Sequence, residues 1–127
     1  MMSQAPLKIR FQRQSQQLTL VFSDDFAPTL SAEFLRVHSP SAEVKGHGPN
    51  QAVLQVGKRD VKIESLEPAG NYALKIFFDD GHNTGIYSWE YLSHLGHHQE
   101  SLWQDYLKAL EEKGQSRDKD TSIVRFV

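Results

Sequence analysis

The sequence predicts an α+β fold: a small antiparallel β-sheet of about five to six strands, a short helix in the middle and two C-terminal helices. Two observations predict it. Up to about residue 78, short segments alternate apolar with polar residues, which is the period of a strand with one buried face. From Ser88 onward, apolar residues recur every three or four positions, which is the period of an amphipathic helix.

The strand pattern occurs in five segments. They are residues 7–12, 18–22, 53–56, 61–66 and 72–78. A short link rich in Gln and Ser predicts a hairpin between the first two, and residues 68–71 (Pro-Ala-Gly-Asn) predict a turn between the last two. Residues 79–83 (Asp-Asp-Gly-His-Asn) predict a tight polar turn after the last strand.

Three segments carry helix signals. Residues 31–37 predict a short helix that Pro40 prevents from continuing, and residues 39–50 are expected to form a loop. The stripe that begins at Trp89 ends at Gly96, and a longer stripe over 102–110 ends before Gly114, a predicted C-terminal cap. The aromatic residues of these stripes, Trp89, Trp103 and Tyr106, are expected to pack in the core.

The chain is expected to contain one domain, residues 7–113, after an N-terminal extension of residues 1–6 and before a mobile tail of residues 114–127. The first residues have no basic stretch followed by an apolar one, so no signal peptide is predicted. No apolar window approaches the ~18 residues of a membrane span. We therefore expect a cytoplasmic protein that does not contact a membrane.

Composition excludes several classes of function. The chain has 14 basic and 16 acidic residues and a net charge of −2, whereas a nucleic-acid-binding domain usually has a basic excess. It has no cysteine, which excludes disulfides, thiolate metal sites and a cysteine nucleophile. Neither a glycine-rich phosphate loop nor a G-x-S-x-G nucleophile elbow is present.

The densest polar cluster is the turn Asp79-Asp80-Gly81-His82. One interpretation is structural, with an aspartate bonding backbone amides and Gly81 supplying a positive φ. The other is a functional turn that contacts a metal or a ligand through His82, with Tyr87 and Trp89 nearby. Sequence reasoning leaves both open.

The remaining histidines give weaker signals. His94 and His98 are four residues apart, but Gly96 between them argues against a shared helix face. His98-Gln99-Glu100 satisfies the first half of an oxygenase facial triad, yet no histidine follows it. A self-contained oxygenase is therefore not expected.

Residues 67–74 and 78–92 resemble a small bacterial domain family of unknown function, similar to the N-terminal domain of gamma-butyrobetaine hydroxylase and also called DUF971. The Asp-Gly-His turn and the Tyr-Ser-Trp that follows carry most of the likeness. Residues 35–43 and the Gly-His-Gly loop at 46–48 fit it too, so the resemblance spans roughly residues 7–97.

The resemblance implies a zinc site built from three cysteines and the histidine of the turn. Carried onto this chain, the cysteine positions fall at Ser39, Ser41 and Val44, and the histidine falls at His82. Hydroxyls are poor zinc ligands and valine is none, so we expect no cofactor, with zinc or iron possible by resemblance alone. The alternative is a site rebuilt around His82. Its helpers would come from His38, Glu43, His47 and the aspartates beside His82, Asp79 above all.

The functional prediction is a stand-alone, non-catalytic interaction or accessory domain. The hydroxylase barrel has no counterpart in this sequence, and domains of this kind occur beside larger catalytic or iron–sulfur assembly domains. We therefore expect a protein partner in metal or iron–sulfur metabolism and a monomer or weak homodimer. The first alternative is a metal-binding protein that uses His82. The second is a small enzyme or ligand binder at Asp80, His82 and Tyr87.

Overall fold

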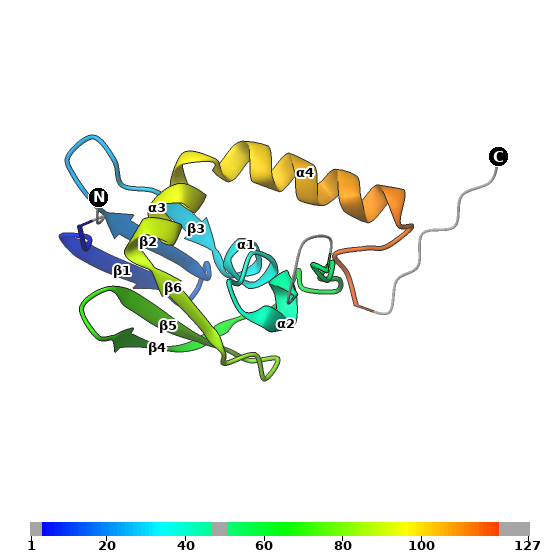
Figure 1. The fold of residues 1–127 in the computed structure, drawn as a ribbon, viewed down its shortest axis with the longest axis horizontal. Coiled ribbons are helices and arrows are strands. Elements are labelled where there is room, and N and C mark those ends of the chain that lie inside the picture. Colours follow the sequence, from blue (N-terminus) through cyan, green and yellow to red (C-terminus); the bar gives the residue numbers. More distant parts are fainter. Residues whose placement is uncertain (1–3, 47–50, 120–127) are drawn as a thin grey trace.

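The computed structural model describes residues 4–46 and 51–119 and confirms an α+β fold (Figure 1). Its strands form two antiparallel sheets of three strands each, rather than one sheet. The first sheet consists of β1 (Lys8–Gln12), β2 (Gln17–Val21) and β3 (Thr29–Ser31), in that order. The second consists of β4 (Ile63–Ala69), β5 (Ala73–Phe78) and β6 (Gly85–Ser88).

Four helices complete the described part of the chain. They are α1 (Ala32–Val37), α2 (Ala42–Lys45), α3 (Trp89–His97) and α4 (Gln99–Glu112). Serine side chains cap the first three: Ser31, Ser41 and Ser88 each accept a hydrogen bond from a backbone N–H two or three residues ahead. Such caps satisfy amides that the first turn leaves without a partner.

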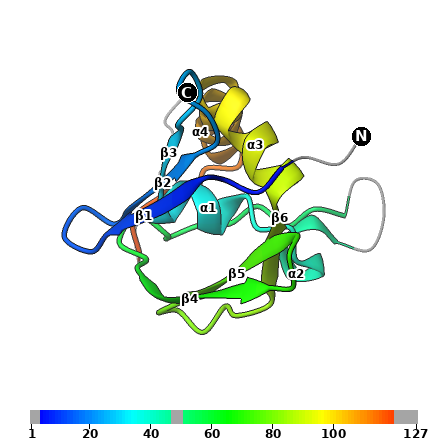
Figure 2. The ribbon, with the colours of Figure 1, turned by 90° about the vertical axis from the view of Figure 1, so that its left-hand side faces the viewer.

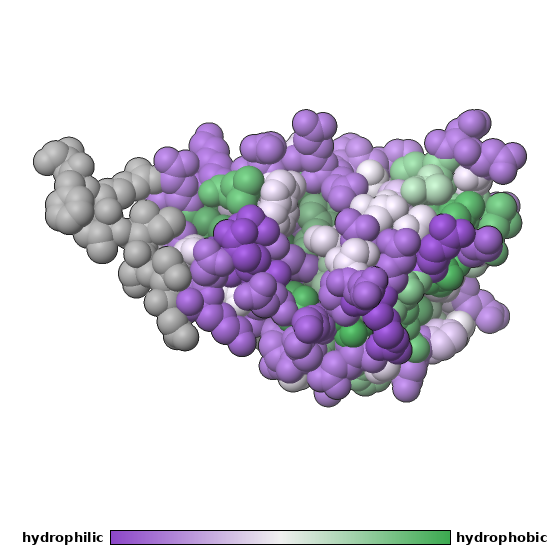
Figure 3. All heavy atoms as spheres, turned by 180° about the vertical axis from the view of Figure 1, so that it is seen from behind, coloured by the Kyte–Doolittle hydropathy of each residue, from purple (hydrophilic) through white to green (hydrophobic). Residues whose placement is uncertain are grey.

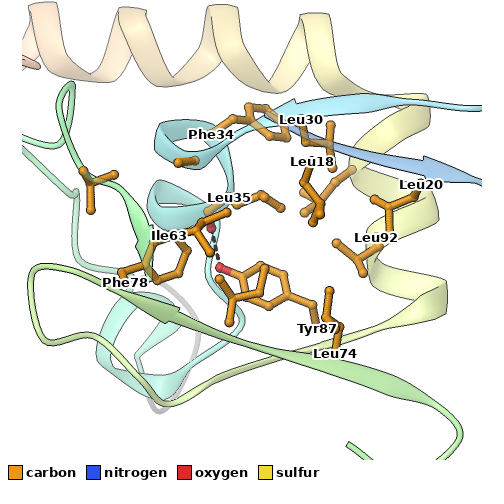
Figure 4. Packing of buried hydrophobic residues seen from close by; sticks show 14 of the residues in the cluster. Leu18, Leu20, Leu30, Phe34, Leu35, Ile63, Leu74, Phe78, Tyr87 and Leu92 are labelled. Atoms are coloured by element: carbon orange, nitrogen blue, oxygen red, sulfur yellow. Dashed lines mark hydrogen bonds between the residues drawn. The ribbon is translucent and has the colours of Figure 1, made fainter. Parts of the chain in front are cut away.

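Helix α1 lies between the two sheets (Figures 1 and 2). All six of its residues are buried, because the sheets flank it and residues of α4 also pack on it. The sheets contribute alternate apolar residues to the same core, among them Leu18 and Leu20 from β2 and Leu74 from β5 (Figure 4). The central position of α1 also buries its charged residues Glu33 and Arg36, which consequently need partners of opposite charge or hydrogen bonds.

The structure corrects several predicted elements. Residues 53–56 form no strand; they run beside α2, where the Val53 amide bonds the Val44 carbonyl, and no neighbouring strand pairs with them. The predicted loop at 39–50 contains α2. Strands β3 and β6 were missed, since three or four residues are too few to show a period. The turn at 79–83 consequently joins two strands instead of following the last one.

Helices α3 and α4 are nearly continuous. Gly96 does not end α3, as the sequence predicted, but lies inside it and faces Pro28. His98 separates the helices and still donates its backbone N–H to His94. The rings of His94 and His98 therefore lie 4.7 Å apart, contrary to the expectation that Gly96 would separate them.

The segment that follows α4 returns to the body of the domain. Gly114 adopts the predicted positive φ, 63°, and the chain then pairs with residues 57–59 through backbone hydrogen bonds. The Arg117 guanidinium donates to both carboxylate oxygens of Glu33, at 2.6 and 2.7 Å. We expected a mobile tail from residue 114; residues 114–119 make these contacts, and the rest of that segment lies outside the described residues.

Within the described residues, no helix combines the length and the apolar character that crossing a membrane requires.

Candidate functional site

The turn between β5 and β6 faces the segment that follows α1. His82 lies in this turn, and its side chain is only 2% exposed. Its imidazole Nε2 is 2.8 Å from the Ser39 hydroxyl, and its Nδ1 is 3.0 Å from a carboxylate oxygen of Glu43. The fold thus brings together residues more than 35 positions apart in the sequence. We call Ser39, Glu43 and His82 the His82 triad.

Hydrogen-bonding capacity fixes the proton positions in the His82 triad. An ionised carboxylate only accepts, so Nδ1 carries the proton and donates it to Glu43. Nε2 then accepts from the Ser39 hydroxyl, whose oxygen accepts in turn from the backbone N–H of Ser41 at 3.3 Å. Burial lowers the pKa of His82, and Arg36 lowers it further, against the opposing effects of Glu43 and Asp80. The neutral ring is the form that these bonds require.

Asp80 holds the same turn through a second set of contacts. One carboxylate oxygen accepts from the backbone N–H of His82 at 3.1 Å, and the other accepts from Arg36 at 2.8 Å and Lys58 at 2.6 Å. Burial favours the neutral acid, but the hydrogen bonds from Lys58, the His82 amide and Arg36 outweigh it and lower the pKa of Asp80 to about 2. Asp80 is therefore an anion that neutralises buried Arg36.

The other family ligand positions lie close to the triad without completing a metal site. The Ser41 hydroxyl pairs with that of Thr84 at 2.7 Å, and Val44 is a buried apolar residue. Both nitrogens of His82 already have protein partners, and zinc prefers thiolates and imidazoles to hydroxyls. Among the described residues, no group of three or more His, Asp or Glu side chains is arranged to hold a metal ion. These residues do not fit the zinc site that the resemblance implies.

The remaining candidates from the sequence lie elsewhere. Asp79 accepts from the backbone N–H of Lys62, and no hydrogen bond joins it to His82 within the described residues. His38 bonds the Phe34 carbonyl through Nδ1, and its ring packs against the Phe34 ring at a tilt of 41°. His47 lies outside the described residues.

Three other candidates have structural roles in the fold: Tyr87, Trp89 and Gly81. Tyr87 is fully buried and donates its hydroxyl to the Leu35 carbonyl (Figure 4), and burial raises its pKa. Trp89 is buried and its indole donates to the Asn71 carbonyl. Gly81 has a φ of 89°, as the structural interpretation of the turn requires.

The His82 triad has the connectivity of a serine hydrolase triad, with a hydroxyl, an imidazole and a carboxylate in order. Access distinguishes it from one. Ser39 is fully buried, and its hydroxyl is so close to Gly85 that a Cβ there would lie 2.8 Å from it. Ser39 borders the cavity described below, but none of its own surface is exposed, whereas a nucleophile needs room for a substrate carbonyl and donors for the developing oxyanion. Ser39 therefore acts as a hydrogen-bond partner of His82.

A cavity of about 310 Å³ opens beside the triad. Its wall is largely apolar and aromatic and includes one cationic side chain, that of Lys45. The lining residues are Val37, His38, Ser39, Val44, Lys45, Ala52, Val53, Leu54, Gln55, Tyr91 and Tyr106. Sequence reasoning missed this cavity because its lining comes from five separate segments, and a lone lysine before Gly46 gives no motif.

Comparisons with known proteins agree with this architecture. The sequence model of the family described as gamma-butyrobetaine hydroxylase-like, N-terminal, matches residues 9–93. Two structures solved by NMR in solution are similar over 98% of this chain. The first is 49% identical to this chain, has a TM-score of 0.84 and is covered over 98% of its own length. The second is 42% identical, has a TM-score of 0.77 and is covered over 93% of its own length.

A crystal structure from Acidithiobacillus ferrooxidans ATCC 23270, described as a protein of unknown function in the DUF971 family, is 36% identical with a TM-score of 0.58. The match covers 72% of this chain and 91% of that one. No curated protein matches. The fold and the triad thus define a small α+β domain whose histidine turn is held by internal hydrogen bonds. The chain belongs to the gamma-butyrobetaine hydroxylase-like N-terminal domain family.

Proposed function

We propose that this chain is a non-catalytic interaction domain, which contributes binding contacts to a protein partner and performs no reaction itself. The observation that carries the proposal is that both ring nitrogens of His82 form hydrogen bonds inside the protein. The one nucleophile beside it, Ser39, is buried. The chemistry-bearing groups therefore serve the fold, and the surface is left for recognition.

The surface supports recognition better than catalysis. On the face shown in Figure 3, hydrophilic residues dominate and hydrophobic ones form separate patches between them. Over the described residues, six large hydrophobic side chains are exposed, with Leu7 at 77% and Tyr72 at 64%. The family resemblance directs the search for a partner to proteins of metal and iron–sulfur metabolism.

The proposed interaction is tested by affinity capture from cell extract, followed by reconstitution of the complex from purified components. We expect a saturable complex of defined stoichiometry in sedimentation velocity, with the folded domain required. If no captured protein forms such a complex when purified, the interaction proposal is wrong.

The metal-binding alternative is tested separately. The protein is purified without a histidine tag, its zinc and iron are measured, and its thermal midpoint is compared with and without a chelator. We expect metal well below one equivalent and an unchanged midpoint, because hydrogen bonds rather than a metal join the turn to residues 39–43. One bound equivalent whose removal lowers the midpoint would establish the alternative.

A further inference from the structure

Among the described residues, Lys45 is the only cationic group on the wall of the cavity beside the His82 triad. Its ammonium lies 4.2 Å from the centre of the Tyr91 ring, which also lines the cavity. His38, on the same wall, is held neutral: burial lowers its pKa, the Phe34 carbonyl opposes this, and nearby Lys45 lowers the pKa further. The cavity therefore carries one positive charge from its described residues.

Over residues 4–46 and 51–119, no carboxylate serves as a counter-ion to that charge. Glu43, the carboxylate nearest to Lys45 in the sequence, bonds His82 and Thr84, and Asp80 in the turn pairs with Arg36 and Lys58. Partial burial lowers the pKa of Lys45, although the residue as a whole is exposed, so its ammonium can be reached by a ligand from solvent.

The remaining wall offers apolar contact and few free donors. The Tyr91 hydroxyl donates to the His38 carbonyl at 2.6 Å, and the Tyr106 hydroxyl donates to the Gln55 carbonyl at 2.8 Å. Both rings thus present apolar surface, next to Val37, Val44 and Leu54. A ligand here would place its acceptor on Lys45 and its apolar part on these side chains.

We propose that this cavity, named the Lys45 cavity, binds a small monocarboxylate with an apolar body, whose carboxylate pairs with Lys45 and whose body packs between Val44, Tyr91 and Tyr106. The volume of about 310 Å³ is at the low end of the range for small-molecule sites, roughly 300–1,000 Å³, and so suits a small ligand. A single ammonium matches a single carboxylate, whereas a phosphate dianion usually has several donors. The proposal is independent of the protein partner proposed above.

The site is tested by titrating ¹⁵N-labelled protein with hexanoate and following amide chemical shifts. Two further probes separate the two parts of the recognition: hexanol has the same body without the charge, and acetate has the charge without the body. We expect saturable shifts at the residues lining the Lys45 cavity. Hexanol should bind about tenfold more weakly because it lacks the charge that pairs with Lys45. Acetate should also bind at least about tenfold more weakly, because it lacks the apolar body.

The matched variants are Lys45→Met and Lys108→Met. Met keeps the apolar stem of the lysine, and Lys108 is an exposed lysine on α4 that serves as the control. We expect Lys45→Met to weaken hexanoate about tenfold and Lys108→Met to change nothing. A second cavity, lined by Phe34, Glu100 and Trp103 among others, has no lysine or arginine on its wall and should not respond.

Three results would each overturn the proposal. In the first, hexanoate gives no saturable shifts in a protein whose spectrum shows the native fold. In the second, hexanol binds as tightly as hexanoate, which would make the site merely apolar. In the third, Lys45→Met and Lys108→Met bind hexanoate equally, which would place the anion elsewhere on the surface.

Discussion

At the scale of single residues, His82 organises the candidate site by hydrogen bonding. Its two ring nitrogens connect the Asp-Gly-His turn to Ser39 and Glu43, positions that lie on either side of the start of α2. The family resemblance implies a zinc site of one histidine and three cysteines at these positions. The same three-dimensional neighbourhood is therefore held here by a hydroxyl and a carboxylate.

Removing the Ser39 hydroxyl tests this role directly. Ser39→Ala leaves the buried Nε2 of His82 without its donor, so we expect a loss of about 1–3 kcal/mol in the free energy of unfolding. Ser101→Ala is the control, because that hydroxyl is exposed on α4 and bonds only the His98 carbonyl. Urea unfolding measures both. Equal, small effects would mean that the Ser39–His82 bond contributes little.

Asp80 gives a pH-dependent prediction. Its folded pKa of about 2 is below its unfolded value of 3.8, so its stabilisation is present above pH 4 and is lost as the pH falls toward 2. Asp80→Asn should cost about 2–3 kcal/mol at pH 7, because it leaves the nearly buried Arg36 without its anion.

The difference between wild type and Asp80→Asn should shrink as the pH falls from 4 to 3, as measured by urea unfolding at each pH. A difference that stays constant over this range would show that the pKa of Asp80 is not lowered by the fold.

At the scale of elements, helix α3 depends on a glycine for its packing. A Cβ at Gly96 would lie 2.6 Å from Cγ of Pro28 and 3.0 Å from the Phe26 ring. Alanine is the better helix former by ~1 kcal/mol, but overpacking costs about 1–3 kcal/mol, so the two effects oppose each other. The short contact is to the rigid ring of proline, so we expect crowding to prevail.

The prediction is that Gly96→Ala destabilises the wild type and is neutral or stabilising in a Pro28→Gly background. A double-mutant cycle by thermal unfolding measures the coupling between the two sites. If Gly96→Ala has the same effect in both backgrounds, the glycine is not required for the approach of Pro28.

The elements that the sequence predicted and those that it missed differ in physical kind. Alternating strands such as β2 and the stripes of α3 and α4 were predictable, because each buries one face with a regular period. The strand expected at 53–56 failed because an apolar run needs a neighbour to pair with, and only the tertiary fold shows that none is there. Gly96 was misread because its contact with Pro28 spans 68 positions.

The candidate site, too, depends on tertiary contacts that the sequence pattern does not show. Sequence reasoning singled out His82 and weighed Glu43 among its possible companions, and these two side chains are in contact. It could not place Lys45, Tyr91 and Tyr106 around one cavity, since they come from α2, α3 and α4. Trp89 is buried, as the helical stripe predicts, but no pattern in the sequence showed that Tyr87 is fully buried.

At the scale of the whole molecule, the segment after α4 secures the central helix. Arg117 pairs with Glu33, whose side chain is 8% exposed, and lies over the Trp103 ring at 5.0 Å. The nearby pair of Arg59 and Asp118 is 45% exposed at both ends. The two pairs join the same segment to the body and differ mainly in burial.

This difference predicts unequal effects of two similar substitutions. Arg117→Gln should cost about 2–4 kcal/mol, because it leaves a buried carboxylate without its cation. Arg59→Gln should cost about 0–1 kcal/mol, as for exposed ion pairs. Chemical unfolding of both variants checks the ranking. Comparable losses would indicate that Glu33 does not depend on the segment after α4.

The most direct test of the central claim is an NMR measurement of the His82 imidazole nitrogens, with and without one equivalent of zinc. We predict a neutral ring with the proton on Nδ1, which remains neutral when the pH falls somewhat below 6.5 and whose nitrogen shifts zinc leaves unchanged. A metal-induced shift of either His82 nitrogen would contradict the claim that this histidine is a structural hydrogen-bonding group rather than a metal ligand.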